Sequence, residues 1–163
     1  MTELYTIGHS NHDLLDFLKI LERYGIRSLV DVRSDPYSRY SPQFNKNELQ
    51  RHLEAAGIEY RYSGAYIGGK PRDSSLHTSR GKPDYDALAD TEEFQTELKL
   101  VVATAEKKTC ALMCGEADPM ACHRERLLAQ VLRAWGVKVT HIMPDGSAAE
   151  PAGSIRRTSP APV

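Results

Sequence analysis

The sequence has 163 residues, and its formal charges almost cancel, with 21 Lys and Arg against 22 Asp and Glu. Hydrophobic residues make up 40% and charged residues 26%, which is ordinary for a globular domain. No run approaches the roughly 18 apolar residues that a membrane span needs, and the near-neutral charge argues against a protein that binds DNA nonspecifically.

The first predicted elements are a strand and an amphipathic helix. Residues 4–7 form a short apolar run, and the helix after it has apolar residues at i, i+3, i+4 and i+7: Leu14, Phe17, Leu18 and Leu21. Ser10 and Asp13 fit a capping box at the start of this helix, and Gly25 is placed to end it.

A second strand and a second helix follow after a connection that contains two prolines. The strand is predicted over 28–32 and the helix over 46–56, with Asn45 and Glu48 as its caps. Alternating residues predict a third strand over 58–62.

The rest of the chain repeats this alternation after a long polar segment. Residues 63–90 are rich in Gly, Pro and Ser and predict a loop, whose length is typical of functional loops. A third helix follows Thr91, a fourth strand covers 110–113, a fourth helix 124–135 and a fifth strand 137–142.

A Gly followed by a β-branched residue ends a predicted helix three times, at Gly25-Ile26, Gly57-Ile58 and Gly136-Val137. This rhythm favours right-handed crossover connections. We therefore expect an α/β fold, with a three-layer, mostly parallel Rossmann-like sheet of about five strands flanked by helices. One domain over residues 1–146 would hold this sheet, and residues 147–163, rich in Ala, Pro, Ser and Gly, would form a flexible tail.

The three cysteines, Cys110, Cys114 and Cys122, fall within thirteen residues. An odd, low count argues against a disulfide scaffold, and the first residues lack the basic-then-apolar pattern of a signal peptide. We therefore expect a cytoplasmic protein with no membrane partner. The clustering of the cysteines is the first indication of a site.

Polar residues gather where the predicted strands end. Ligands of open α/β sheets bind beyond the carboxyl ends of the strands. The segments expected at that edge are Gly8-His9-Ser10, Asp31-Val32-Arg33, Gly68-Gly69-Lys70, Cys114-Gly115-Glu116 and Cys122-His123-Arg124. Their joint placement predicts one functional rim.

Several of these motifs resemble the pattern of the domain of unknown function 488 (DUF488) family, in the same order and spacing from about residue 5 to 142. The matching segments are Ile7-Gly8-His9-Ser10, Asp31-Val32-Arg33, Ser41-Pro42-Gln43-Phe44-Asn45, Gly57-Ile58-Glu59-Tyr60, Gly68-Gly69, Ala111-Leu112-Met113-Cys114-Gly115-Glu116 and Cys122-His123-Arg124. The family has no established activity. The resemblance therefore supports the fold and the site and implies no reaction.

Cys114 is the first candidate for chemistry because it ends a strand. It would act as a nucleophile or ligand, with Glu116 close enough to influence it, or it would be a packed thiol under the loop. Cys110, earlier on the same strand, is expected in the core. Cys122, His123 and Arg124 begin a helix, whose N-terminus favours anions.

Arg124 is predicted to clamp an anion, and Cys122 beside it to have a lowered pKa, unless Cys122 or His123 merely caps the helix. Asp31 and Arg33 point to one side of their strand, either to orient a catalytic group or to hold the loop. His9 would be a general acid or base, or would hydrogen-bond the first helix cap.

Residues 33–72 combine tyrosines with basic residues, a mixture that can stack bases and hold phosphates, or that can be an ordinary half-buried strand with solvated arginines.

We assign catalytic roles to Cys114, Glu116, His9, His123 and Asp31. We assign anion or substrate binding to Arg33, Arg124, Cys122, Ser10, Gly69, Lys70 and Tyr37. No metal ligands are assigned, because the spacing of Cys114 and Cys122 matches no standard zinc site, although His9 or His123 could complete one in space. The cofactor, if any, is unknown.

Three functions fit these residues. The favoured one is an enzyme that acts on an anionic substrate, either phosphorylated, a nucleotide or a nucleic acid. The second is a non-enzymatic nucleotide or nucleic-acid binding protein. The third is a rhodanese-like sulfurtransferase or a cysteine phosphatase-like enzyme, suggested by Asp31-Val32-Arg33. Cys114 lies ten positions before Arg124 and Cys122 only two, so neither makes the short Cys-to-Arg loop of those enzymes.

Overall fold

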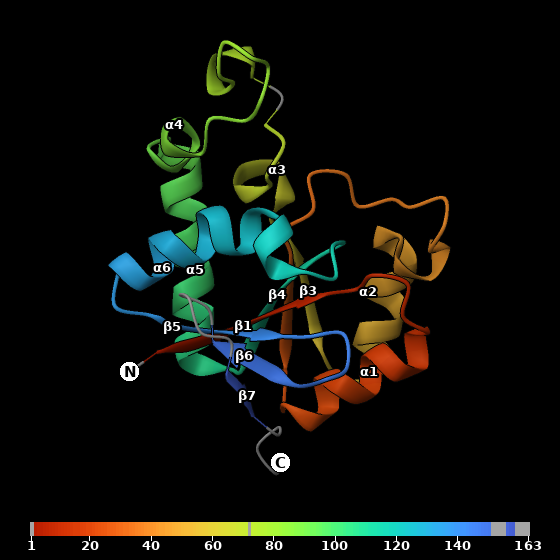
Figure 1. The fold of residues 1–163 in the computed structure, drawn as a ribbon. Coiled ribbons are helices and arrows are strands. Elements are labelled where there is room, and N and C mark those ends of the chain that lie inside the picture. The colour runs from red at the N-terminus through yellow and green to blue at the C-terminus, as the bar shows by residue number, and fades with distance from the viewer. Residues whose placement is uncertain (1, 72, 151–155, 159–163) are drawn as a thin grey trace.

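A computed structural model describes residues 2–71, 73–150 and 156–158 and contains alternating strands and helices (Figure 1). The first half holds β1 (Glu3–Gly8), α1 (Leu14–Arg23), β2 (Ser28–Asp31), a 3₁₀ turn (Pro42–Phe44), α2 (Lys46–Ala55) and β3 (Glu59–Tyr62). The second half holds α3 (Gly64–Ile67), a 3₁₀ turn (Ser74–Leu76), α4 (Tyr85–Ala89), α5 (Glu92–Lys107), β4 (Cys110–Cys114), a 3₁₀ turn (Pro119–Ala121), a π-helical segment (Arg124–Ala129), α6 (Gln130–Ala134), β5 (Lys138–Ile142), β6 (Ala148–Glu150) and β7 (Arg156–Thr158).

The strands form one sheet in the order β3-β2-β4-β1-β5-β6-β7. The first five strands in this order are parallel, and β6 and β7 are added antiparallel at the edge beyond β5. Gly8 at the end of β1 is in register with Cys114 at the end of β4. The segments that follow these two central strands therefore leave the sheet side by side.

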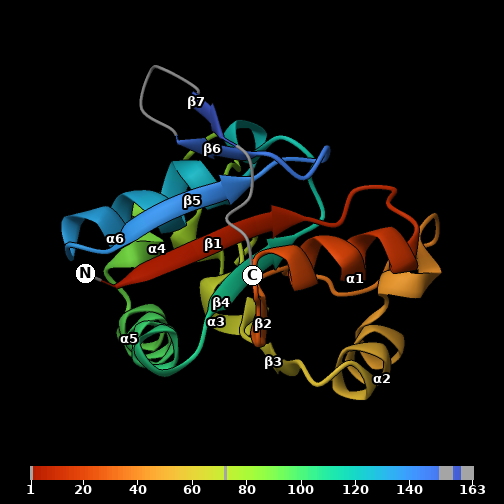
Figure 2. The same cartoon turned by 90° about the horizontal axis from the view of Figure 1, so that it is seen from below.

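Helices cover both faces of the sheet, as the view along it shows (Figure 2). On one face the core is built from α1 and α2, with buried side chains that include Phe17, Leu21, Leu49 and Leu53. On the other face it is built from α5 and the helix that ends in α6, with Phe94, Leu98, Leu128 and Leu132. The predicted three-layer, mostly parallel α/β fold is confirmed.

The side-chain caps predicted for the starts of α1 and α2 do not form. Helix α1 begins after Asp13, which makes no side-chain capping bond, and Ser10 has a left-handed backbone with φ of 48°. This turn displaces Ser10 from the helix start, so the capping box does not form. At α2, the Asn45 side chain accepts a hydrogen bond from the Ser38 N–H at 2.6 Å instead of capping the helix. Asn45 thereby ties down the connection that leads to the site.

Two segments predicted to be irregular contain ordered elements. The predicted loop over 63–90 includes α3 and α4, which sequence patterns miss because each is five residues or shorter. The predicted flexible tail begins with β6, whose Ala148 and Ala149 are buried beside β5. Small side chains and a tight turn, closed by the Met143 N–H on the Ser147 carbonyl at 2.7 Å, allow this pairing. Residues 151–155 and 159–163 of the tail lie outside the described residues.

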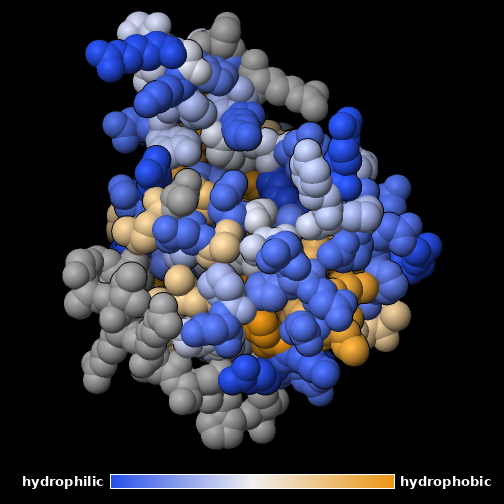
Figure 3. Space-filling view, turned by 45° about the vertical axis from the view of Figure 1, so that its right-hand side comes forward, coloured by the Kyte–Doolittle hydropathy of each residue, from blue (hydrophilic) through white to orange (hydrophobic). Residues whose placement is uncertain are grey.

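The outer surface is mainly hydrophilic on the face shown in Figure 3, where apolar side chains appear in small patches. Within the described part of the chain, no helix is long and apolar enough to cross a membrane.

Candidate functional site

A cavity of about 480 Å³ lies at the carboxyl edge of the sheet, where the predicted rim was expected. Every candidate residue except Asp31 and Arg124 lines it: His9, Ser10, Arg33, Tyr37, Gly69, Lys70, Cys114, Glu116, Cys122 and His123. The wall is completed by residues to which the sequence assigned no role: Ser34, Asp35, Ser38, Ser41, Tyr85 and Gly115. The fold therefore brings together segments that are more than one hundred residues apart.

Two glycines allow the walls of this cavity to approach closely. A Cβ atom at Gly8 would lie 1.7 Å from the Glu116 carbonyl oxygen, and one at Gly69 would lie 2.8 Å from the His123 ring. Real side chains do not fit such spaces. Gly8 therefore lets the loop after β4 cross the end of β1, and Gly69 lets its segment pack on His123.

Cys114 and Cys122 are neighbours in space, with their sulfur atoms 3.3 Å apart. Cys122 Sγ also accepts hydrogen bonds from the backbone N–H of Arg124 at 3.4 Å and from its Nε–H at 3.3 Å. The Cys114 thiol is almost completely buried, whereas Cys122 is partly exposed. Cys122 is thus the more accessible of the two thiols that line the cavity.

The two thiols have opposite pKa shifts. The hydrogen bond from Cys114 lowers the pKa of Cys122 well below its usual value, and His123 and the Arg124 guanidinium act in the same direction, against burial. The pKa of Cys114 is raised, first because its proton is held in the bond to Cys122 and then by burial. These directions favour the thiolate at Cys122 and the protonated thiol at Cys114.

Arg124 has a different position from the predicted anion clamp. Its side chain is fully buried, and its Nη2 donates to the carbonyl oxygens of Glu116 at 2.7 Å and Ala117 at 3.3 Å. These N–H groups are used within the protein, so they do not face a ligand in the cavity. Arg124 fixes the loop after β4 and supports the Cys122 sulfur.

A buried chain of hydrogen bonds continues behind Arg124. Its Nη1 donates to the Thr6 hydroxyl at 3.3 Å, and Thr6 bonds to Nδ1 of His141, its register partner on β5. His141 Nε2 donates in turn to Glu125 at 3.1 Å, which accepts two bonds of 2.8 Å from Arg133. Burial lowers the pKa of His141, which favours its neutral ring. In that form Nδ1 accepts from Thr6 and Nε2 donates to Glu125, so the hydrogen bonds run from Arg124 to the Glu125 carboxylate.

Asp31 also lies behind the cavity wall, where it holds Arg33. It is fully buried and accepts bonds from Arg33 Nε at 2.9 Å and Nη2 at 2.8 Å. The Tyr60 hydroxyl donates to the same carboxylate at 2.6 Å. The remaining guanidinium nitrogen, Nη1, lies 3.3 Å from His9 Nε2. Asp31 thus fixes the orientation of a cation that lines the cavity.

The two cavity histidines are held by main-chain carbonyl groups. His9 Nδ1 donates to the Ser10 carbonyl at 2.8 Å, and its ring stacks on Phe44 with centroids 4.6 Å apart. Burial lowers the pKa of His9 to about 4, so the ring is neutral at neutral pH. His123 Nε2 donates to the Val32 carbonyl at 3.1 Å. Each ring is therefore fixed in one orientation at the wall.

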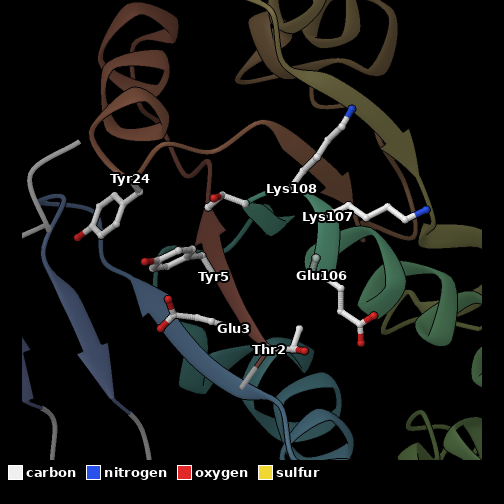
Figure 4. Close-up of a pocket in the computed structure, with 9 residues that line it drawn as sticks. Thr2, Glu3, Tyr5, Tyr24, Glu106, Lys107 and Lys108 are labelled. Carbon is white, nitrogen blue, oxygen red and sulfur yellow. The ribbon is translucent and has the colours of Figure 1, made fainter.

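A second cavity, of about 490 Å³, lies near the amino end of β1 (Figure 4). Glu3, Tyr5 and Tyr24 lie on one side of it and Lys107 and Lys108 on the other (Figure 4). Its described lining contains neither cysteine nor histidine, and no group of His, Cys, Asp or Glu among the described residues is arranged to hold a metal ion. The nucleophilic groups are concentrated at the carboxyl edge.

The comparisons with known proteins agree with the resemblance seen in the sequence. A family model described as "Domain of unknown function DUF488" matches residues 13–132. No curated protein and no solved structure matches the chain.

Proposed function

The chain belongs to the DUF488 family, and we propose that it is an enzyme that uses the Cys122 thiolate as a nucleophile on an anionic substrate. The observation that carries the proposal is the position of the Cys122 sulfur. It borders the cavity and accepts hydrogen bonds from Arg124 and from the Cys114 thiol. A thiolate stabilised in this way is the reactive form of cysteine at neutral pH.

The cations of the cavity support an anionic substrate. Lys70 is exposed at the cavity, and Arg33 presents a guanidinium whose orientation is fixed by Asp31. The anionic group of the substrate would lie against these two side chains, which places its electrophilic atom near Cys122. Glu116, exposed beside Cys114, and His123 are the groups available for proton transfer to the leaving group.

This assignment exchanges the roles expected for the cysteines. Cys114 was the first candidate for the nucleophile, but it is almost fully buried and holds its proton. In the proposed reaction Cys122 attacks, and Cys114 keeps it in the thiolate form through its S–H group.

The alternative of a nucleic-acid binding surface is less well supported by the contacts of segment 33–72. Tyr60 and Tyr62 donate their hydroxyl protons to Asp31 and to the Ser34 carbonyl, and Arg61 is paired with Glu97. Tyr37, Tyr40 and Tyr66 are the exposed tyrosines of this segment, and of these Tyr37 lines the cavity. Binding of a single-stranded oligonucleotide at low salt, measured by fluorescence polarisation, would favour the alternative.

Alkylation kinetics test the nucleophile. We expect iodoacetamide to modify Cys122 rapidly even near pH 6, where an ordinary thiol with a pKa of about 8.5 is almost entirely protonated. The fast phase should disappear in Cys122→Ser and persist in Cys110→Ala. Modification of Cys122 at the rate of an ordinary thiol would contradict the proposal.

A charged reagent tests the anion preference. At low ionic strength, the rate of Cys122 alkylation by the anion iodoacetate should rise relative to the rate with neutral iodoacetamide. Lys70→Gln should reduce this rise. Lys107→Gln, beside the cavity near the opposite end of β1, is the matched control (Figure 4).

Turnover itself is tested with aryl phosphates and with thiosulfate plus cyanide, in each case comparing the wild type with Cys122→Ser. A covalent adduct on Cys122 in peptide mass spectra would identify the class of group transferred.

A further inference from the structure

Group transfer needs one nucleophilic cysteine, but this site holds a second cysteine directly beside it. A second sulfur lies 3.3 Å from the nucleophile, and it belongs to Cys114, which lines the same cavity but is only 3% exposed. Serine or a backbone N–H could stabilise the thiolate equally well by hydrogen bonding. A thiol at this place can in addition form a covalent bond with its neighbour.

Cys110 shows how a purely structural cysteine differs in this chain. It lies on the same strand as Cys114, is fully buried and belongs to the core on the α5 face. Burial raises its pKa to about 12. The chain therefore carries an internal control, a cysteine that should stay reduced when the pair reacts.

We propose that Cys114 and Cys122 are an oxidation site for small hydroperoxides, in which Cys122 is oxidised and Cys114 closes a disulfide with it. The proposal rests on the same reactive Cys122 as the proposed enzyme. It adds a reaction of that site with a second class of molecule. The cavity of about 480 Å³ admits a small peroxide, and the partly exposed sulfur is the one that the peroxide meets first.

The reaction balances in two steps. The Cys122 thiolate attacks one oxygen of the hydroperoxide ROOH, the O–O bond breaks, and the products are Cys122 sulfenic acid and ROH, with one proton taken from solvent. The Cys114 sulfur then attacks the Cys122 sulfur, the S–OH bond breaks, and water leaves with the Cys114 proton. The pair loses two electrons to the peroxide, and a dithiol reductant returns them.

The positions of the two sulfurs make closure a short movement. A disulfide bond is about 2.05 Å long, so the sulfurs must approach by little more than 1 Å from their present contact. Cys114 ends β4 and Cys122 follows a 3₁₀ turn, and the contact of their sulfurs joins these two points of the chain. Closure converts the thiolate into a neutral disulfide sulfur and removes the nucleophile until it is reduced.

Thiol counting on the full chain tests the proposal. Treatment with an equimolar amount of hydrogen peroxide should remove two of the three titratable thiols, and dithiothreitol should restore both. Peptide mass spectrometry should locate a bond between Cys114 and Cys122 and leave Cys110 reduced. The wild-type peptide map needs no variant, so the test does not depend on the folding of a mutant.

Variants separate the two steps. Cys114→Ser should stop at the sulfenic acid, which dimedone traps on Cys122, and Cys122→Ser should lose the fast reaction with peroxide. Cys110→Ala should behave as the wild type. Wild-type oxidation confined to Cys122, a bond that includes Cys110, or a fast reaction in Cys122→Ser would each overturn the proposal.

Alkylation and peroxide oxidation, measured together, distinguish failure of the oxidation site from failure of the proposed enzyme. Fast alkylation of Cys122 without disulfide formation would overturn the oxidation site and leave the nucleophile in place. Slow alkylation with a peroxide-induced disulfide would do the reverse. If both reactions are slow, both proposals fall.

Discussion

At the scale of single residues, Arg124 makes more of the contacts that hold the site together than its position at a helix start suggests. Arginine at a helix start beside a cysteine usually indicates a contact with a bound anion. Here the guanidinium is fully buried and divides its N–H groups among a sulfur, a hydroxyl and two carbonyl groups. It fixes the loop that carries Glu116 and, at the same time, acts to lower the pKa of Cys122.

Arg124→Lys tests this double role. A lysine keeps the charge but loses the planar arrangement of donors that reaches all four partners. We expect the pKa of Cys122 to rise by roughly one unit, which moves the midpoint of its alkylation profile to higher pH by the same amount. The pH profile of iodoacetamide labelling measures this change. The control is Arg126→Lys, at an exposed arginine of the same helix, and an equal shift of the midpoint there would refute the specific role of Arg124.

Tyr60 supports the cavity through Asp31, which it reaches from β3. Tyr60→Phe removes the hydroxyl that donates to this buried carboxylate at 2.6 Å. The loss should lower the free energy of unfolding by about 1–3 kcal/mol, because the Asp31 oxygen stays buried with one donor fewer. Urea unfolding followed by circular dichroism measures it. Tyr40→Phe, at a tyrosine that is 92% exposed, should leave the midpoint unchanged, and a similar loss there would argue against the Asp31 contact as the cause.

At the scale of elements, the site depends on which strands lie next to each other. Thr6 and His141 are register partners on β1 and β5, and their contact completes the chain of hydrogen bonds from Glu125 to Arg124. Gly8 and Cys114 are register partners on β1 and β4, which places the cysteine loop over the end of β1. The central strand β1 therefore positions both the front and the rear of the cysteine site.

Strand β6, between β5 and β7, covers the β5 side of this arrangement. Ala148→Glu would bury a carboxylate beside the core on the α1 face, where Ala148 is 7% exposed. A buried charge without a partner costs several kcal/mol unless the strand detaches, so we expect the melting temperature to fall by several degrees. Differential scanning fluorimetry measures the change. Ala103→Glu, on the exposed side of α5, provides the control and should shift the melting temperature little.

At the scale of the whole molecule, the sequence predicts the parallel layers well because helix periodicity and the Gly-β-branched boundaries are local signals. The rim was also predictable, since polar segments follow β1, β2 and β4 and parallel strands end at one edge. The lowered pKa of Cys122 was predicted from its place at a helix start, but the choice of Cys122 over Cys114 as nucleophile and the inward position of Arg124 were not. They depend on an Sγ–Sγ contact across eight residues and on a side chain that turns inward, which no local pattern encodes. Tyr85 was missed because its short helix lies in a segment with the composition of a loop.

The buried neutral histidine at the rim makes the stability of the whole fold depend on pH. The pKa of His9 is about 4 in the folded protein because of burial, against 6.5 as its ordinary value. The unfolded chain therefore binds the proton more readily, and the free energy of unfolding decreases as the pH falls from about 6.5 to about 4. The shift corresponds to about 3 kcal/mol for this one group. His141, whose pKa burial also lowers, acts in the same direction.

Substitution of His9 isolates its share of this dependence. In His9→Asn the amide can still donate to the Ser10 carbonyl, but the titrating group is gone, so the loss of stability between about pH 6.5 and pH 4 should be smaller than in the wild type. Urea unfolding at a series of pH values measures the difference, and His52→Asn on α2 serves as the control. If the wild type and His9→Asn lose the same free energy over this interval, His9 is not the neutral group at the rim. The Arg33 contact at Nε2 would then have to join two cations, which their separation of 3.3 Å disfavours.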